Sequence, residues 1–220
     1  MKKLFMIFAG LISLGFSNSA SAESVSGSLG YRHDYISGKT KVFQGDLVIG
    51  STSVPLGAGF SVDHWFAYDL AGKEFFERDW SLVKKFYFSG GDVAVSTSAN
   101  LYSFGEGYGD FAERGDAASI EANVSTSIME GVSLFGGAET ITIVSCPSDF
   151  TTAYAGVKLQ AGDLYLKPRF QVQTNDSPYL RIDLGGSIDA GNGISVDPSV
   201  RLVVAEDRQP MAQADVKICF

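Results

Sequence analysis

No apolar run in this sequence is long enough to cross a membrane as a helix. Such a helix needs about 20 consecutive apolar residues, whereas the longest apolar segment, residues 4–16, is shorter and contains Ser13 and two glycines. Only helices and closed β-barrels satisfy every backbone hydrogen bond in lipid. If the mature chain lies in a membrane, it must therefore cross it as strands.

Histidine, cysteine and proline are scarce, and basic residues are outnumbered. Two histidines among 220 residues give little support to Ser-His catalysis or to a His-rich metal site. The chain has 25 acidic and 17 basic residues, for a net charge of −8, which argues against nucleic acid because a phosphate backbone binds a basic face. We therefore expect no enzyme, no metal, no other cofactor and no nucleic-acid partner.

The N-terminus has the pattern of a secretory signal peptide. Lys2 and Lys3 precede the apolar segment, and Ala20-Ser21-Ala22 follows it as an Ala-x-Ala cleavage motif. This pattern predicts that residues 1–22 are removed and that residues 23–220 form one exported domain.

The C-terminal segment alternates strictly and ends in an aromatic residue. Its apolar members are Ala212, Ala214, Val216, Ile218 and Phe220. Strands of membrane barrels alternate lipid-facing apolar residues with lumen-facing polar ones. The terminal Phe220 resembles the assembly signal of bacterial outer-membrane proteins. That resemblance implies residence in the Gram-negative outer membrane, with lipid and the barrel-assembly machinery as partners.

Alternation of this kind recurs in about twelve segments, each near the 9–11 residues that a tilted barrel strand needs. Short turns are predicted at 89–92, 130–131, 160–163 and 189–193, and longer loops at 69–79, 103–118, 145–150, 173–178 and 206–210. Two connections depart from this order, a short loop at 37–39 and a longer turn at 50–57. Short turns on one rim and long loops on the other are typical of outer-membrane barrels, with both termini in the periplasm.

The predicted fold is therefore all-β: a transmembrane, antiparallel, up-and-down barrel of about twelve strands. The alternative is a soluble periplasmic sandwich, which has the same alternation. The aromatic residues favour the membrane barrel over the sandwich, because aromatic side chains gather at the headgroup level of a bilayer. Alternation assigns Tyr31, Tyr35, Tyr68 and Trp80 to the rim with the loops, and Phe86, Phe88 and Phe220 to the rim with the turns. It also assigns Leu47 and Ile49 to the lipid face.

Residues of the opposite parity are predicted to line the lumen. The basic ones are Arg32, Lys85, Lys158, Lys167, Arg169, Arg181, Arg201 and Lys217, and the acidic ones are Asp46, Asp63, Glu121, Glu139, Asp183 and Asp215. All of the bases except Lys85 fall between the eighth predicted strand and the first, whereas most acids fall on the strands between. Bases on one side of the lumen and acids on the other create an electric field across it. Such a field guides charged or dipolar solutes. The alternative is that these charges neutralise one another and fill a narrow barrel.

The longest loop, residues 103–118, is acidic, aromatic and rich in glycine. Two interpretations remain open for it. It folds inward as a constriction, or it is a solvated surface loop.

The segment Gly30-Tyr31-Arg32-His33-Asp34-Tyr35, the signal peptide and the basic lumen residues together resemble the monomeric oligogalacturonate-specific (KdgM-like) porins. That resemblance implies tracks of lumen arginines and lysines for acidic oligosaccharides, with Arg32 as the position that can be carried over. We expect a porin for passive diffusion of small hydrophilic solutes, of anionic sugar or oligosaccharide character. The alternative is a non-conducting barrel that acts as an adhesin or structural anchor through its loops.

An outer-membrane phospholipase would be similar in size. That family uses a His-x-Ser pair, whereas His33 is followed by Asp-Tyr and His64 by Trp-Phe. The chain therefore lacks the nucleophile that this enzyme requires.

Overall fold

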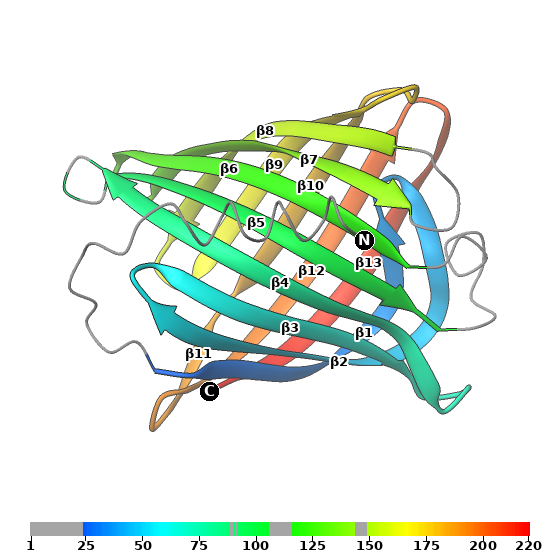
Figure 1. The fold of residues 1–220 in the computed structure, drawn as a ribbon, viewed down its shortest axis with the longest axis horizontal. Helices are drawn as coiled ribbons and strands as arrows, with labels where there is room; N and C mark the ends of the chain where they lie inside the picture. The colour runs from blue at the N-terminus through cyan, green and yellow to red at the C-terminus, as the bar shows by residue number, and fades with distance from the viewer. Residues whose placement is uncertain (1–23, 89, 91, 106–115, 144–148) are drawn as a thin grey trace, which may run out of the picture.

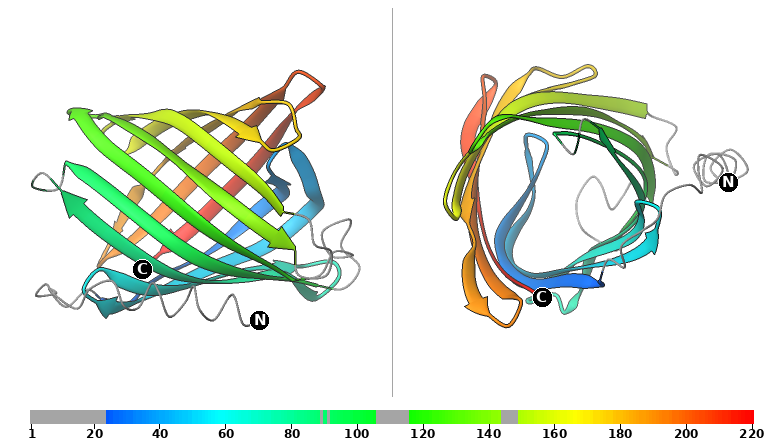
Figure 2. Two further views of the ribbon diagram at one scale, coloured as in Figure 1. Left: turned by 45° about the horizontal axis from the view of Figure 1, so that its top comes forward. Right: turned by 90° about the vertical axis from the view of Figure 1, so that its left-hand side faces the viewer.

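The strands of this protein form one closed antiparallel barrel (Figures 1 and 2). The computed structural model describes residues 24–88, 90, 92–105, 116–143 and 149–220. The predicted signal peptide lies outside these residues.

The described residues form thirteen strands. They are β1 (Ser26–Ser37), β2 (Thr40–Gly57), β3 (Phe60–Asp69), β4 (Glu74–Phe88), β5 (Val93–Phe104), β6 (Ala117–Met129), β7 (Val132–Ile143), β8 (Asp149–Ala161), β9 (Leu164–Gln173), β10 (Tyr179–Gly186), β11 (Ile188–Gly191), β12 (Ile194–Ala205) and β13 (Arg208–Cys219). Ser187 alone separates β10 from β11, and both pieces pair with β12. The wall therefore has twelve strand positions, which confirms the predicted fold class.

Pairing of the two terminal strands closes the barrel. β1 is antiparallel to β13, and Gly27 and Phe220 exchange two backbone hydrogen bonds, of 2.8 and 2.9 Å. Among the described residues, no helix has the length and apolar character needed to cross a membrane.

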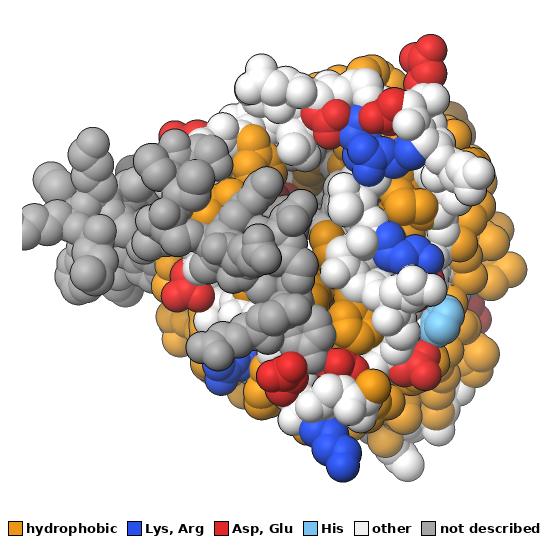
Figure 3. All heavy atoms as spheres, turned by 90° about the vertical axis from the view of Figure 1, so that its right-hand side faces the viewer, with side chains coloured by type: hydrophobic (Ala, Val, Ile, Leu, Met, Phe, Trp, Pro, Cys, Tyr) orange, Lys and Arg blue, Asp and Glu red, His pale blue; other side chains and the backbone are white. Residues whose placement is uncertain are grey.

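The outer surface is apolar, as the alternation predicts. On neighbouring strands, Leu184 pairs with Leu166 and Val200, and these three side chains are 53%, 38% and 43% exposed. Figure 3 looks at one end of the barrel: apolar side chains cover the outer wall, whereas charged ones gather around the mouth. Such a belt of exposed apolar side chains is typical of the lipid-facing surface of a membrane barrel.

Leu184→Arg should destabilise the folded barrel by about 2–4 kcal/mol if Leu184 lies near the bilayer midplane, because a charge there must leave water. Thr152→Arg, at a position that lines the lumen cavity, is the matched control and should cost much less. Urea titrations of both variants in lipid vesicles measure the difference. Equal losses of stability would contradict the assignment of these two faces.

Two connections are shorter than predicted. Residues 50–57 belong to β2, which pairs with β3 as far as Gly57↔Phe60, so the turn predicted there is wrong. The actual turn is Ala58-Gly59, with φ values of 51° and 75°. Pro55 is tolerated because the ladder shifts register between Pro55 and Gly57. Similarly, β4 begins at Glu74, so only residues 70–73 of the predicted loop 69–79 connect two strands.

The tip of the β1–β2 hairpin leaves the wall and folds into the lumen. β1 pairs with β13 only as far as His33↔Ala214, and β2 pairs with β3 only from Leu47↔Asp69. Residues 34–46 therefore have none of the described wall strands paired beside them, and the right view of Figure 2 shows this hairpin inside the ring of strands. We call residues 34–46 the inner hairpin.

Backbone geometry explains where the inner hairpin departs. Asp34 and Gly45 stand at its two ends with φ values of 60° and 131°, and the β1–β2 register shifts between His33 and Tyr35. Asp34 fixes the bend, since its carboxylate accepts from Gly45 N at 3.0 Å and from Lys41 Nζ at 2.5 Å. Such bulges redirect side chains to the other face of a strand.

Both faces of the inner hairpin are covered. On one face Ile36 packs against Tyr179 and Val203, and all three are at most 3% exposed. On the other face the Tyr35 ring lies 5.9 Å from that of Trp65 and 5.7 Å from that of Phe76. The backbone N–H of Ile36 donates to Gln213 Oε1 at 3.0 Å, which replaces a missing strand partner.

The predicted lipid-facing positions of three residues are wrong. Tyr35 lies inside the barrel, and Leu47 and Ile49 are 0% and 1% exposed, in a cluster with Phe76. The physical reason is the inner hairpin, since it brings apolar side chains into the lumen. In this part of β1 and β2, the apolar positions of the alternating pattern therefore do not identify side chains that contact lipid.

Glu206, between β12 and β13, and Glu130, between β6 and β7, lie on opposite rims and are exposed. In a background without the native cysteines, Glu206→Cys should react with a membrane-impermeant thiol reagent in intact cells. Glu130→Cys should react only after the outer membrane is disrupted, because short turns face the periplasm in barrels of this kind. The opposite labelling pattern would reverse this orientation.

Candidate functional site

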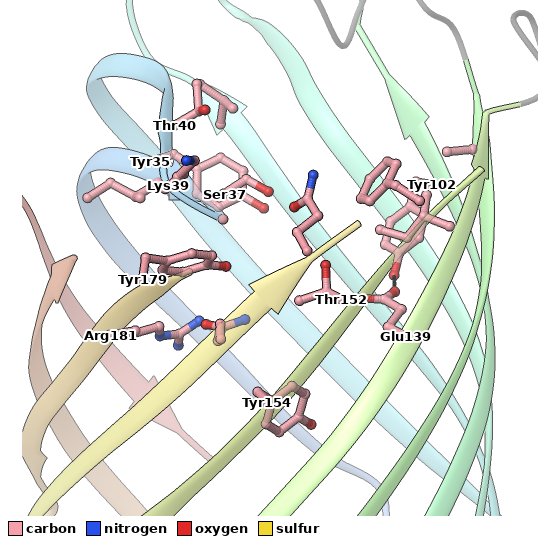
Figure 4. Close-up of a pocket in the computed structure, with 18 of the residues that line it drawn as sticks. Tyr35, Ser37, Lys39, Thr40, Tyr102, Glu139, Thr152, Tyr154, Tyr179 and Arg181 are labelled. Carbon is pink, nitrogen blue, oxygen red and sulfur yellow. Dashed lines mark hydrogen bonds between the residues drawn. The ribbon is translucent and has the colours of Figure 1, made fainter. Parts of the chain in front are cut away.

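A cavity of about 730 Å³ lies in the lumen beneath the inner hairpin. Strands from opposite sides of the barrel contribute to its lining, and residues 35–42 cover part of it. Figure 4 shows the side chains that point into it, with Arg181 and Glu139 on opposite sides. The cavity is therefore a section of the lumen itself.

Three arginines on neighbouring strands form one side of this cavity, which we call the basic wall: Arg169, Arg181 and Arg201. Arg181 pairs with Arg169 across β9 and β10, and Arg201 pairs with Asp183 across β10 and β12. The carboxylate of Asp183 accepts from Arg181 Nε at 2.8 Å and from Arg201 Nε at 2.9 Å. One carboxylate thus partly neutralises two guanidinium groups, and the wall stays positive.

Arg169 is the least neutralised member of the basic wall. Its guanidinium lies 5.0 Å from the centre of the Tyr154 ring. Its Nε is buried and has no hydrogen-bond partner among the residues that the structure describes. This donor is available to an anionic group in the cavity.

Four carboxylates form the opposite side, which we call the acidic wall: Glu77, Asp79, Glu121 and Glu139. Glu121 and Glu139 face each other across β6 and β7. Glu139 is held by Tyr102 OH at 2.5 Å and by Ser119 Oγ at 2.6 Å, both as donors, and Glu121 accepts from Tyr154 OH at 3.2 Å. Oε2 of Glu77 and Oδ1 of Asp79 are buried without a hydrogen-bond partner within the described ranges.

Glu77 and Asp79 were missed by the sequence analysis because they fall in the predicted loop 69–79. A signal was present. Trp80, Leu82 and Phe86 share one parity, and Glu77 and Asp79 have the opposite parity, so extending that strand towards its N-terminus would have placed both carboxylates in the lumen.

Of the residues predicted to line the lumen, the cavity brings together Arg169, Arg181, Arg201, Glu121 and Glu139, with Asp183 bonded to two of them. Their role in a solute path stays a prediction.

Arg32 and Asp215 form a separate pair in the wall between β1 and β13. Arg32 Nε and Nη2 donate to the two oxygens of Asp215 at 2.8 and 2.9 Å, and both residues are buried. The guanidinium also lies 4.9 Å from the Tyr35 ring centre and 5.6 Å from that of Trp65. Arg32 is thus enclosed by protein groups beside the inner hairpin.

The remaining predicted lumen residues lie away from the cavity lining. Lys167 Nζ is 4.4 Å from the Phe135 ring centre, and Lys158 Nζ is 5.7 Å from that of Tyr165. Asp63 accepts from Ser53 Oγ at 2.6 Å. Lys217 pairs with Gly30 and Asp197 in the ladder, and Lys85 pairs with Ser96.

The prediction that Asp46 lines the lumen is wrong. Asp46 pairs with His33, and its Oδ1 contacts His33 Nδ1 at 2.8 Å and accepts from Tyr31 OH. The side chains of His33 and Asp46 are 58% and 51% exposed, on the side opposite to the buried Arg32. The physical reason is the alternation in β2: the next residue, Leu47, is buried inside the barrel, so Asp46 takes the opposite, exposed face of the strand.

Two further predictions concern single segments. Phe220 is 64% exposed at the β1–β13 closure, and its role as an assembly signal stays a prediction. Most of the 103–118 loop falls on residues 106–115, outside the described part of the chain. Among the described residues, the inner hairpin lies in the lumen (Figure 2), which the sequence analysis did not anticipate.

Within the described ranges, no three His, Cys, Asp or Glu side chains are grouped as the ligands of one metal ion. The acidic wall is therefore spread along β4, β6 and β7 and is not gathered around a point.

The closed twelve-position wall with a polar lumen has the fold of an outer-membrane porin. Among solved structures, the chain is similar to KdgM porin in complex with disordered oligogalacturonate, with a TM-score of 0.60, 11% identity and coverage of 88% of this chain and 98% of that one. A second KdgM porin structure gives 0.59, 10%, 88% and 98%. NanC porin gives 0.52, 9%, 89% and 98%. At these identities the likeness shows the fold. No protein-family model matches the sequence, and no curated protein matches it.

Proposed function

We propose that this chain is an outer-membrane porin for passive diffusion of small hydrophilic solutes of anionic, sugar-like character. The observation that carries this proposal is the basic wall beside a lumen cavity of about 730 Å³, where the Asp183 carboxylate binds only two of the three guanidinium groups. Arginine is well suited to such solutes, since its planar fork matches carboxylate and phosphate oxygens.

The same proposal includes the route to the membrane. Residues 1–22 direct export and are cleaved, the C-terminal strand with Phe220 engages the barrel-assembly machinery, and both termini face the periplasm. The apolar outer surface supports this location. KdgM porin, which has the same fold, has been solved with oligogalacturonate, and this supports an acidic sugar as the solute class.

Solute uptake into proteoliposomes tests the proposal. Digalacturonate should enter faster than a neutral disaccharide of the same size, because the basic wall raises the local concentration of anions. Liposomes without protein, and liposomes with a small barrel whose lumen is filled, are the controls. Uptake of neither sugar would contradict a channel, and equal uptake of both would contradict the anion preference.

A second candidate is a non-conducting barrel that acts through its loops as an adhesin or anchor. The inner hairpin favours it, because apolar side chains such as Ile36 and Phe76 fill part of the lumen. In that case the protein would bind its partner at the cell surface and neither sugar would enter the liposomes.

A further inference from the structure

Among the described residues, five acidic and five basic side chains line the lumen cavity. At its roof the charges are paired locally: Lys39 contacts Asp176 at 2.5 Å and Lys41 contacts Asp34 at 2.5 Å. Below the roof they are separated onto the acidic wall and the basic wall. A solute with charge of one sign is therefore attracted by one wall and repelled by the other.

The buried atoms without partners differ between the two walls. Among the described residues, the unpaired buried atom of the basic wall is a donor, Nε of Arg169, whereas those of the acidic wall are carboxyl oxygens, Oε2 of Glu77 and Oδ1 of Asp79. Glu77 is only 5% exposed. Buried polar atoms are rarely left without a partner, so these atoms indicate where a ligand's polar groups fit.

Gln171 adds an independent observation. It is 6% exposed, it lines the same cavity on β9, and its Oε1 has no partner in the part of the chain that the structure describes. Gln171 is two residues from Arg169, so a hydroxyl or amine donor of the solute meets an acceptor next to the basic wall.

We propose that this cavity binds solutes that carry both an anionic and an ammonium group, such as amino acids and amino-sugar acids. The anionic group accepts from Arg169. The ammonium group donates to Glu77 and Asp79, since it has three donors and no acceptor. The volume of about 730 Å³ is in the range of cavities that hold small ligands. This inference rests on the proposed channel function for the solute's route to the cavity.

Four related sugars separate the two solute charges. Glucose is neutral, glucosamine carries only the ammonium group, glucose 6-phosphate only the anionic group, and glucosamine 6-phosphate both. In single-channel recordings of the whole barrel in a planar bilayer, each sugar is added and the duration of its current blockades is measured. Glucosamine 6-phosphate should reside about tenfold longer than glucose 6-phosphate, the effect of one additional charge-assisted hydrogen bond.

Variants assign this advantage to the walls. Glu77→Gln combined with Asp79→Asn should bring glucosamine 6-phosphate down to the residence time of glucose 6-phosphate. Glu121→Gln tests the same wall at a less buried carboxylate and should reduce the advantage in part. Asp163→Asn, an exposed carboxylate in the β8–β9 turn, is the matched control and should leave all four sugars unchanged.

Equal residence of the two phosphates in the unaltered protein would overturn the proposal and leave the channel function standing. An advantage that persists in the Glu77 and Asp79 variant would also overturn it. A protein that passes no current would overturn both the channel and the binding. The comparison of four sugars on the unaltered protein decides the proposal even where a variant does not fold.

Discussion

Lys39→Met should release the inner hairpin from the rim and raise the single-channel conductance. Lys39 Nζ contacts Asp176 at 2.5 Å, Asp207 at 2.8 Å and Ser177 Oγ at 2.6 Å, so one ammonium ties the hairpin to the β9–β10 and β12–β13 loops. In the part of the chain that the structure describes, no wall strand pairs with residues 34–46, and these contacts are therefore a main restraint on the tip. Methionine keeps most of the unbranched side chain, lacks the ammonium group, and so removes all three contacts.

Single-channel recordings measure this change as a larger unitary current with additional open levels. Lys73→Met, at an exposed lysine in the β3–β4 turn, is the matched control and should leave the current unchanged. Unaltered conductance in Lys39→Met would mean that the remaining contacts hold the hairpin: the apolar packing of Ile36 and Tyr35, and backbone hydrogen bonds such as that from Ile36 N–H to Gln213 Oε1 and that from Arg208 Nη1 to the Lys39 carbonyl.

Lowering the pH should raise the single-channel conductance, as Lys39→Met should. The hydrogen bond from Lys39 lowers the pKa of Asp207 below its ordinary 3.8, so its contribution is present above pH 3.8 and is lost as the pH falls through the lowered pKa. Hydrogen bonds to Asp176 and Asp207 raise the pKa of Lys39 above 10.5, so its contribution is lost only in stronger base. The wild-type current should therefore show an acid transition that Lys39→Met lacks.

Replacing Arg169 and Arg181 together with glutamine should shift the reversal potential toward cations. Both side chains line the cavity, and acidic loops beyond about 8 Å are largely screened at physiological salt. A unit charge about 4 Å from an ion in water is worth about 1 kcal/mol, so each substitution should lower the anion-to-cation permeability ratio by about fivefold. The change at Arg169 should be the larger, because Asp183 already holds Arg181.

Recordings with unequal salt on the two sides measure this ratio. Arg78→Gln serves as the matched control, since Arg78 is exposed and its guanidinium lies over the outward Phe75 ring at 5.1 Å. If the double variant kept the wild-type ratio while the barrel stayed folded, these bases would be structural partners of Asp183 and Tyr154 and not a wall for solutes.

The barrel could be predicted because the strands, the turns and the C-terminal segment each have a recognisable sequence pattern. Alternating segments predict strands with one apolar face, glycine-rich turns such as Glu130-Gly131 predict hairpins, and the closing strand ends at Phe220. These signals are local, and antiparallel neighbours in sequence are also neighbours in the wall. Each short stretch therefore carried the information needed for its own pairing.

The inner hairpin could not be predicted in the same way. Its departure depends on two positions, Asp34 and Gly45, whose positive φ values change the face of the following residues. Its apolar residues find cover on Tyr179, Val203 and Phe76, which lie far away in sequence. A period-two pattern assigns such residues to lipid, because it holds no information on what lies inside the barrel.

The candidate site was predicted in part for the same reason. Arg169, Arg181 and Arg201 lie on regular strands, and their parity was sufficient. Glu77 and Asp79 follow a bulge at Phe76, where the β3–β4 register shifts between Ala67 and Tyr68. The charged segment around them was interpreted as a loop. Glu77 and Asp79, two of the four carboxylates of the acidic wall, were therefore missed.

Recording the current of the purified, folded protein in a planar bilayer tests the central claim most directly, which is that the lumen beneath the inner hairpin is an open, polarised passage. Stepwise insertion of discrete conductances, with a reversal potential of weak to moderate anion preference despite the net charge of −8, is the predicted result. Folded protein that inserts without passing current, or channels that prefer cations, would contradict it.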